Sequence, residues 1–369
     1  MNADQAIHVC YALQHESFAL DIDLNLPLRG ITGVFGVSGA GKTSLLRCIA
    51  GLERPAIGRL VVAGDVWQDS VSGRWRAAHE RDVGYVFQEP RLFAHLDVRG
   101  NIEYGLRRRV HDRAPDMAHV VGLLGLEHLL SRRPEQLSGG EAQRVAIARA
   151  LLCAPRFVLM DEPLASLDQA RKDEILPFLD RLHAEAEVPI IYVSHNIDEV
   201  GRLCDYLVVM DEGRVVADGD LQSVLVRMDV PSLGGAQAGS VIQGKAQAYD
   251  ESDDLTRLRF SGGDLWVPGK AELNGATLRL RIRANDVSLC RTMPEQSTIL
   301  NIVPAIVETM QADSGPSILV RLVLGSDRIV ARVTRRSARE LDLKEGDEVY
   351  AQIKSVAVRT AAAGGHRYD

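Results

Sequence analysis

The sequence predicts a layered α/β domain followed by a small all-β domain. In the first 230 residues, nearly continuous apolar runs of strand length alternate with segments of helical periodicity, a pattern typical of parallel strands covered on both faces. Beyond about residue 240 the apolar positions recur every second residue, which is typical of strands with one buried face. A length of 369 residues also favours two or three domains over one.

The elements of the first part can be placed by their periodicity. The predicted core strands lie at residues 31–35, 157–160 and 190–193. The predicted helices lie at 42–50, 141–152 and 169–185. In the first of these helices, Leu45, Leu46 and Ile49 fall at helical spacing on one face, which we expect to be buried.

The second part begins after a segment of glycine and small residues at 231–240, which has the composition of a linker. We therefore expect one domain at 1–230 and a β-rich domain at 241–369. Apolar and basic residues alternate in one stretch, which reads Leu278, Arg279, Leu280, Arg281, Ile282 and Arg283. Residues 349–358 are also strand-like, and such short strands predict a small OB-like barrel.

The bulk composition indicates an ordinary soluble globular protein, with 46% hydrophobic and 25% charged residues. A net charge of -7 gives no general reason to expect nucleic-acid binding. The chain has no apolar run near the ~18 residues of a spanning helix and no secretory signal at its start. Its 5 cysteines are scattered, as in a reducing cytosol, and predict neither a disulfide framework nor a zinc site.

The segment GVSGAGKT matches the phosphate-loop pattern G-x4-G-K-T, follows an apolar strand and opens a helix. A chance match in a chain of this composition is on the order of 1%. We expect the phosphates of ATP to be held by Gly36, Val37, Ser38, Gly39, Ala40, Gly41, Lys42 and Thr43. Lys42 should contact the β- and γ-phosphates, and the Thr43 hydroxyl should bind Mg²⁺.

Two carboxylates end the predicted strand at 157–160. Asp161 is expected to hold Mg²⁺ through water, and Glu162 to orient or deprotonate the attacking water. An apolar strand that ends in Asp-Glu is weak evidence by itself, because a capped strand end is common. In a chain that also has a phosphate loop, a catalytic role for the two carboxylates becomes the better interpretation.

Between these two motifs stands LSGGE at 137–141. Together the motifs resemble the ATP-binding subunits of ABC transporters over nearly all of residues 1–230. The resemblance implies an ABC-type ATP-binding domain that works as a homodimer. It also implies that Ser138, Gly139 and Gly140 cradle the nucleotide held by the partner chain.

The same resemblance assigns further residues. Gln88 corresponds to the Q-loop glutamine that senses Mg²⁺ and the γ-phosphate, and 166–168 (Ser-Leu-Asp) to the D-loop. His195 corresponds to the switch histidine that contacts the γ-phosphate. For the aromatic side chain that stacks on adenine, Tyr11 is the candidate and Phe18 the alternative.

Several phrases resemble the ATPases of molybdate importers, among them YVFQEPRL at 85–92 and RIRANDVSL at 281–289. The end of the chain resembles a small molybdate-binding β domain at about 297–360. The resemblance implies membrane permease partners, an indirect link to a periplasmic oxyanion-binding protein, and a peripheral place on the cytoplasmic face of the inner membrane. The candidate oxyanion residues are Ser297, Asn301, Lys354 and Ser355. The alternative is a tail that only helps the ATPase to dimerise.

Other functions stay open at this point. A related importer for sulfate, iron or polyamine would share everything before residue 231. A soluble ABC ATPase of DNA repair or translation would usually carry paired nucleotide domains or long coiled-coil insertions, and the sequence has neither. A regulatory module with an inactive nucleotide domain is disfavoured by the intact Lys42, Asp161, Glu162 and His195.

Overall fold

The computed structural model describes residues 6–15, 18–108, 115–185, 188–271, 277–354 and 359–362. By their internal contacts these residues form two compact units. Of the described residues, the first unit contains those within 6–196 and 203–218, and the second contains those within 197–202 and 219–362. The segment predicted as a linker, 231–240, therefore groups with the second unit.

The first unit is built on a 6-stranded sheet with the strand order β11-β10-β3-β9-β8-β7. Its strands are β3 (Ile31–Phe35), β7 (Val83–Val86), β8 (Phe157–Asp161), β9 (Ile190–Ser194), β10 (Tyr206–Asp211) and β11 (Arg214–Asp220). The pairs β7–β8, β8–β9, β9–β3 and β3–β10 are all parallel. The predicted α/β fold with parallel core strands is confirmed.

A second, antiparallel sheet completes this unit. Its strands are β1 (Ala6–His15), β2 (Phe18–Pro27), β4 (Ile57–Val62), β5 (Asp65–Asp69) and β6 (Arg74–Trp75), in the order β2-β1-β4-β5-β6. One apolar core joins this sheet to the parallel sheet and to helix α1 (Lys42–Ala50). Leu45, Leu46 and Ile49 of α1 are fully buried in that core, as their spacing predicts.

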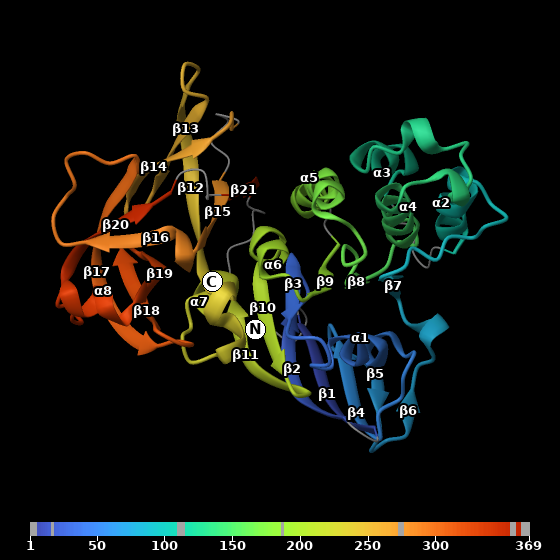
Figure 1. Cartoon of the computed structure of the whole chain (residues 1–369). Helices are drawn as coiled ribbons and strands as arrows, with labels where there is room; N and C mark the ends of the chain where they lie inside the picture. The colour runs from blue at the N-terminus through green and yellow to red at the C-terminus, as the bar shows by residue number, and fades with distance from the viewer. Residues whose placement is uncertain are drawn as a thin grey trace. The chain divides into compact units, whose positions relative to one another are not determined.

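The remaining helices of the first unit are α2 (Val98–Arg107), α3 (Met117–Leu123), α4 (Gly139–Leu151) and α5 (Gln169–Glu185). Figure 1 shows α2, α3 and α4 grouped together beyond the strands. Short 3-10 turns lie at Ala78–Glu80, Glu127–Leu129 and Pro134–Gln136. In the part of the chain that the structure describes, no helix is long and apolar enough to cross a membrane.

The second unit consists mainly of two 5-stranded sheets. One has the order β14-β13-β12-β15-β21, with β12 (Gly239–Asp250), β13 (Leu255–Phe260), β14 (Gly263–Pro268), β15 (Thr277–Arg283) and β21 (Arg359–Ala362). The other has the order β16-β20-β17-β18-β19, with β16 (Val287–Cys290), β17 (Asn301–Ala312), β18 (Ser317–Leu324), β19 (Asp327–Thr334) and β20 (Glu348–Ile353).

A single apolar core runs through both sheets, which confirms the predicted β domain. The helical segments of this part are α6 (Ile197–Leu203), α7 (Leu221–Leu225) and α8 (Arg335–Glu340), with 3-10 turns at Pro231–Leu233, Gly235–Gln237 and Ala284–Asp286.

Candidate nucleotide site

The phosphate loop joins the end of β3 to the start of α1. Lys42 is the first residue of α1, and its Nζ donates to the carbonyl oxygens of Gly36 at 2.8 Å and Val37 at 3.0 Å. Its side chain is only 4% exposed, so the loop closes around the ammonium group. Burial lowers the pKa of Lys42, and the Glu162 carboxylate opposes that shift.

Glycine is required at two points of this loop. Gly41, which precedes α1, has a φ of 95°, where side chains other than glycine are strained, and a Cβ there would lie 2.5 Å from Phe18 Cζ. A Cβ on Gly36 would lie 2.4 Å from the Met210 carbonyl oxygen. Between them, Val37, Ser38 and Gly39 are exposed at the mouth of the loop.

The Asp161 carboxylate is held from two sides. The Thr43 hydroxyl donates to Asp161 Oδ1 at 2.9 Å, and the Tyr85 hydroxyl donates to Oδ2 at 3.0 Å. Burial raises the pKa of Asp161, and these two hydrogen bonds oppose the rise. Hydroxyl and carboxylate oxygens are the donors that Mg²⁺ prefers, so the pair Thr43 and Asp161 fits the expected metal.

Tyr85 is a contact that the sequence analysis missed. It lies on β7, whose parallel pairing with β8 sets Tyr85 opposite Leu159 and Val86 opposite Met160. The hydroxyl thus reaches the carboxylate at the end of the neighbouring strand. The sequence shows a tyrosine in the predicted strand before Gln88. It does not show which strand lies beside that tyrosine, so the contact with Asp161 could not be predicted.

Glu162 links the phosphate loop to the predicted switch histidine. Its Oε1 lies 3.6 Å from Lys42 Nζ, and its Oε2 lies 2.9 Å from His195 Nδ1. Glu162 and His195 directly follow β8 and β9, which are neighbouring parallel strands, so both emerge at the same edge of the sheet. Glu162 has a φ of 45°, an uncommon backbone conformation of the kind found at functional sites.

The other residues assigned by resemblance lie at element ends. Gln88 is exposed just after β7. Ser138 caps α4: its Oγ accepts from the Glu141 amide at 3.3 Å, while the Glu141 carboxylate accepts from the Ser138 amide at 2.7 Å. Ser138 and Gly139 are exposed, and Gly140 is buried against Ile175. This cap leaves the start of α4 open to a ligand or to another chain.

The position of Tyr11 contradicts its assignment as the adenine-stacking side chain. Tyr11 is 1% exposed within the core, and its hydroxyl donates to the Cys48 carbonyl oxygen at 3.3 Å. A ring covered in this way has no face for a base. Phe18, the alternative, is partly exposed and lies against Gly41 of the phosphate loop.

Asn301 is also unsuited to its expected role in oxyanion binding. It is 1% exposed, its amide nitrogen donates to the Trp266 carbonyl oxygen at 3.0 Å, and its amide oxygen accepts from the Trp266 amide at 2.6 Å. These bonds join β14 to β17. Ser297 is exposed, and its hydroxyl accepts from the Ile299 amide. Ser355 lies outside the described residues.

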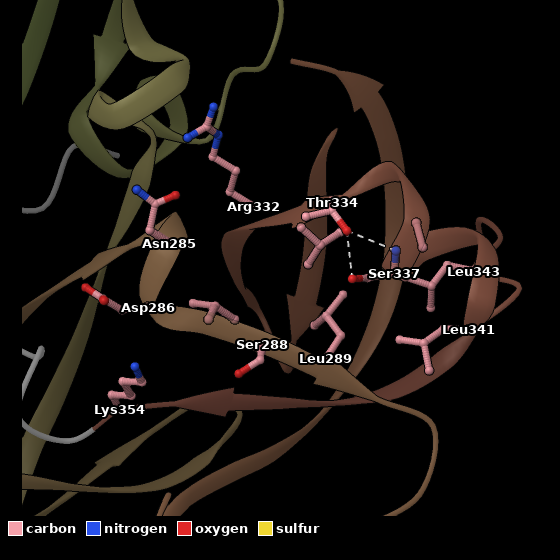
Figure 2. Close-up of a pocket in the computed structure, with 13 residues that line it drawn as sticks. Asn285, Asp286, Ser288, Leu289, Arg332, Thr334, Ser337, Leu341, Leu343 and Lys354 are labelled. Carbon is pink, nitrogen blue, oxygen red and sulfur yellow. Dashed lines mark hydrogen bonds between the residues drawn. The ribbon is translucent and has the colours of Figure 1, made fainter. Parts of the chain in front are cut away.

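Lys354 lines a cavity of about 320 Å³ in the second unit. Figure 2 shows it beside Asp286 and Ser288, with Thr334 and Ser337 hydrogen-bonded to each other at the start of α8. The Lys354 side chain is exposed. Of the four candidate oxyanion residues, the structure therefore places Lys354 in a cavity and takes Asn301 out of consideration.

Comparisons with known proteins agree with this architecture. A family model described as ABC transporter matches residues 20–165, and a TOBE domain model matches 297–360. A molybdenum import ATP-binding protein, ModC 1 of Azotobacter vinelandii, is 49% identical over 360 residues, which is 97% of this chain and 99% of that protein. The corresponding protein of Thiobacillus denitrificans is 52% identical over 357 residues, or 96% and 98% of the two chains.

A solved structure is also similar. It is cbiO1 from Clostridium perfringens, part of the ABC transporter complex cbiONQ, with a TM-score of 0.51 and 29% identity. The similarity covers 61% of this chain and 92% of that chain. Since the identity to the two bacterial proteins extends over nearly the whole length, the chain belongs to the ABC transporter ATP-binding proteins, in the group of the molybdenum import ATP-binding proteins.

Proposed function

We propose that this protein is the ATP-hydrolysing subunit of an ABC import complex that energises molybdate uptake through a membrane permease. The observation that carries the proposal is 49% identity across 97% of the chain to a molybdenum import ATP-binding protein. Importers of sulfate, iron or polyamine would be expected to resemble this chain mainly before residue 231. An identity that includes the second unit favours molybdate over those cargoes.

The geometry supports ATP hydrolysis as the activity. Lys42 is already directed into the phosphate loop by two carbonyl oxygens, so little reorganisation is needed when phosphates enter. Glu162 lies within reach of both Lys42 and His195, which supports its role as a general base beside the γ-phosphate. In this role Glu162 takes a proton from the attacking water, and His195 contacts the γ-phosphate.

Thr43 and Asp161 would hold Mg²⁺, with Gln88 as a third ligand on the neighbouring strand end. When bound, Mg²⁺ neutralises charge on the β- and γ-phosphates. Tyr85 keeps the Asp161 carboxylate in one orientation, because it occupies the oxygen that Thr43 does not contact. Removing the Tyr85 hydroxyl should therefore weaken metal binding.

Catalysis needs two copies of the chain in this proposal. The exposed Ser138 and Gly139 would cradle the ATP held by residues 36–43 of the partner. Mixing a Ser138→Arg chain with a Lys42→Ala chain should restore one intact composite site, and so recover part of the hydrolysis that neither variant shows alone. A mixture as inactive as its components would mean that each site is complete within one chain.

The remaining assignments concern partners and place. The ATPase dimer would bind integral-membrane permease subunits and so lie at the cytoplasmic face of the inner membrane. A periplasmic oxyanion-binding protein would reach it only through the permease. Uptake of radiolabelled molybdate by vesicles that contain the reconstituted complex tests this arrangement. Uptake should depend on internal ATP, exceed sulfate uptake, and vanish with Glu162→Gln.

The second unit offers Lys354, Ser297 and Ser355 for oxyanion binding, at an interface between two tails. Tetrahedral dianions are bound by hydroxyls and amides that converge with a cation. The full chain should then release heat on titration with molybdate, and Lys354→Ala should abolish it. No heat at millimolar molybdate would leave this unit as a dimerisation module.

A further inference from the structure

Two of the three arginines that alternate with apolar residues along β15 are buried. Leu280 and Ile282 point into the apolar core of the second unit, while Arg279 and Arg281 on the opposite face are each only 4% exposed. Arg283, at the end of the strand, keeps a side chain that is 47% exposed. Buried arginines require partners, because a desolvated charge without one is costly.

One short helix, α6, supplies partners to all three arginines. Arg281 Nε is 3.4 Å from Asp198 Oδ1, and Arg283 donates to the other oxygen, Oδ2. Arg279 donates to the carbonyl oxygen of Arg202 at 3.4 Å. The strand therefore holds the first turn of α6 through a carboxylate and its last turn through a carbonyl.

Arg281 is itself fixed in place. Its guanidinium donates to the carbonyl oxygens of Ser240 at 3.3 Å and Gln237 at 3.1 Å. The helix packs directly on its side chain, since a Cβ on Gly201 would lie 3.0 Å from Arg281 Cδ and 3.3 Å from Val241. The contact between α6 and the β sheet thus combines close packing with ion pairing.

Helix α6 closely follows His195 in the chain. By its contacts Ile197–Arg202 groups with the second unit, although the residues before it belong to the first unit. His195, which pairs with Glu162 at 2.9 Å, precedes the helix by one residue, Asn196. Only one residue thus separates the histidine from the helix that β15 holds.

We infer that Arg281 and Arg283 are positioning residues for His195, which they place through Asp198 and α6. The inference rests on the proposed function, because it assigns His195 to ATP hydrolysis. A hydrogen bond such as that between His195 and Glu162 weakens steeply when its geometry moves by about an ångström or less. Holding α6 keeps this pair aligned, while the phosphate loop has no part in the contact.

Arg283→Ala is the variant that tests the inference. It removes the ion pair between Arg283 and Asp198 and leaves the buried ion pair between Arg281 and Asp198, so the fold is kept. The matched control is Arg259→Ala, which removes another partly exposed pair of the second unit, with Asp264 at 3.2 Å. Arg283→Ala should lower kcat for ATP hydrolysis about threefold or more and leave KM unchanged, while Arg259→Ala stays at the wild-type kcat. Arg283→Lys, which retains a cation, should recover much of the loss.

Amide hydrogen exchange gives a readout that does not need hydrolysis. Peptides that cover residues 194–203 should exchange faster in Arg283→Ala than in Arg259→Ala, in the full chain without nucleotide. Equal exchange in the two variants, or a raised KM at unchanged kcat, would overturn the inference. A wild-type protein that did not hydrolyse ATP would instead refute the proposed function, and the exchange experiment would still decide whether the arginines hold α6.

Discussion

Replacing Glu162 by glutamine should separate ATP binding from ATP hydrolysis. The substitution keeps the size of the side chain but removes its charge and its capacity to accept a proton. A positioned general base contributes about 10² to 10⁴ to rate, so we expect kcat to fall by at least about 100-fold. Binding should change in the opposite direction, because Glu162 competes with the phosphates for Lys42.

The size of that competition follows from the contact itself. Glu162 Oε1 and Lys42 Nζ are 3.6 Å apart, with side chains only 19% and 4% exposed. At an effective dielectric constant of about 20, two unit charges at this distance attract by roughly 5 kcal/mol. When ATP binds, contacts between Lys42 and the phosphates replace most of this attraction. If about a quarter of the attraction is not replaced, the Kd for ATP should be about tenfold lower in Glu162→Gln than in the wild type.

Two assays decide the outcome. Phosphate release under steady state gives kcat, and titration with a fluorescent ATP analogue gives Kd. Glu103→Gln is the matched control, since Glu103 pairs with Arg107 on α2 and contacts neither Lys42 nor His195. A Glu162→Gln protein that turned over within tenfold of wild type would place the general base elsewhere. Weaker ATP binding would show that Glu162 does not compete for Lys42.

Three further changes each alter one contact. Tyr85→Phe should raise the Mn²⁺ concentration needed for half-maximal binding in the presence of ADP by about threefold or more, as measured by electron paramagnetic resonance. Tyr206→Phe loses a comparable hydrogen bond to a carboxylate and should not change that concentration. Gly36→Ala sets a methyl group 2.4 Å from a carbonyl oxygen of β10, so it should lower the unfolding temperature and weaken ATP binding in calorimetry; a variant as stable as the parent would contradict this. Phe18→Ala should weaken ATP binding and Tyr11→Phe should not, and equal Kd values for the two would remove Phe18 as the stacking residue.

Much of the nucleotide site could be predicted because it depends on one topological rule. The carboxyl ends of parallel strands meet at one edge of a sheet, and the motifs follow such strands. Thr43, Asp161-Glu162 and His195 lie in three distant parts of the sequence. Three apolar strands nevertheless bring Thr43 within hydrogen-bond distance of Asp161, and Glu162 within hydrogen-bond distance of His195. The apolar runs predicted these strands, and the role of His195 came from the resemblance to the ATP-binding subunits of ABC transporters.

The error at Tyr11 has a different cause. Tyr11 follows Ile7 and Val9 at intervals of two, and all three are buried on the same face of β1. The alternation was present in the sequence and indicates an inward side chain. Periodicity therefore predicts a buried Tyr11, whereas its assignment to adenine depends on its aromatic ring alone. Asn301 is a different case, since only the neighbouring β14 shows what its amide contacts.

Contacts between helices and strands could not be predicted from the sequence. Alternation along β15 distinguishes two faces but does not say that α6, rather than water, covers the basic one. Arg281 and Arg283 could therefore be identified from the sequence as basic residues of a strand, but not as partners of Asp198.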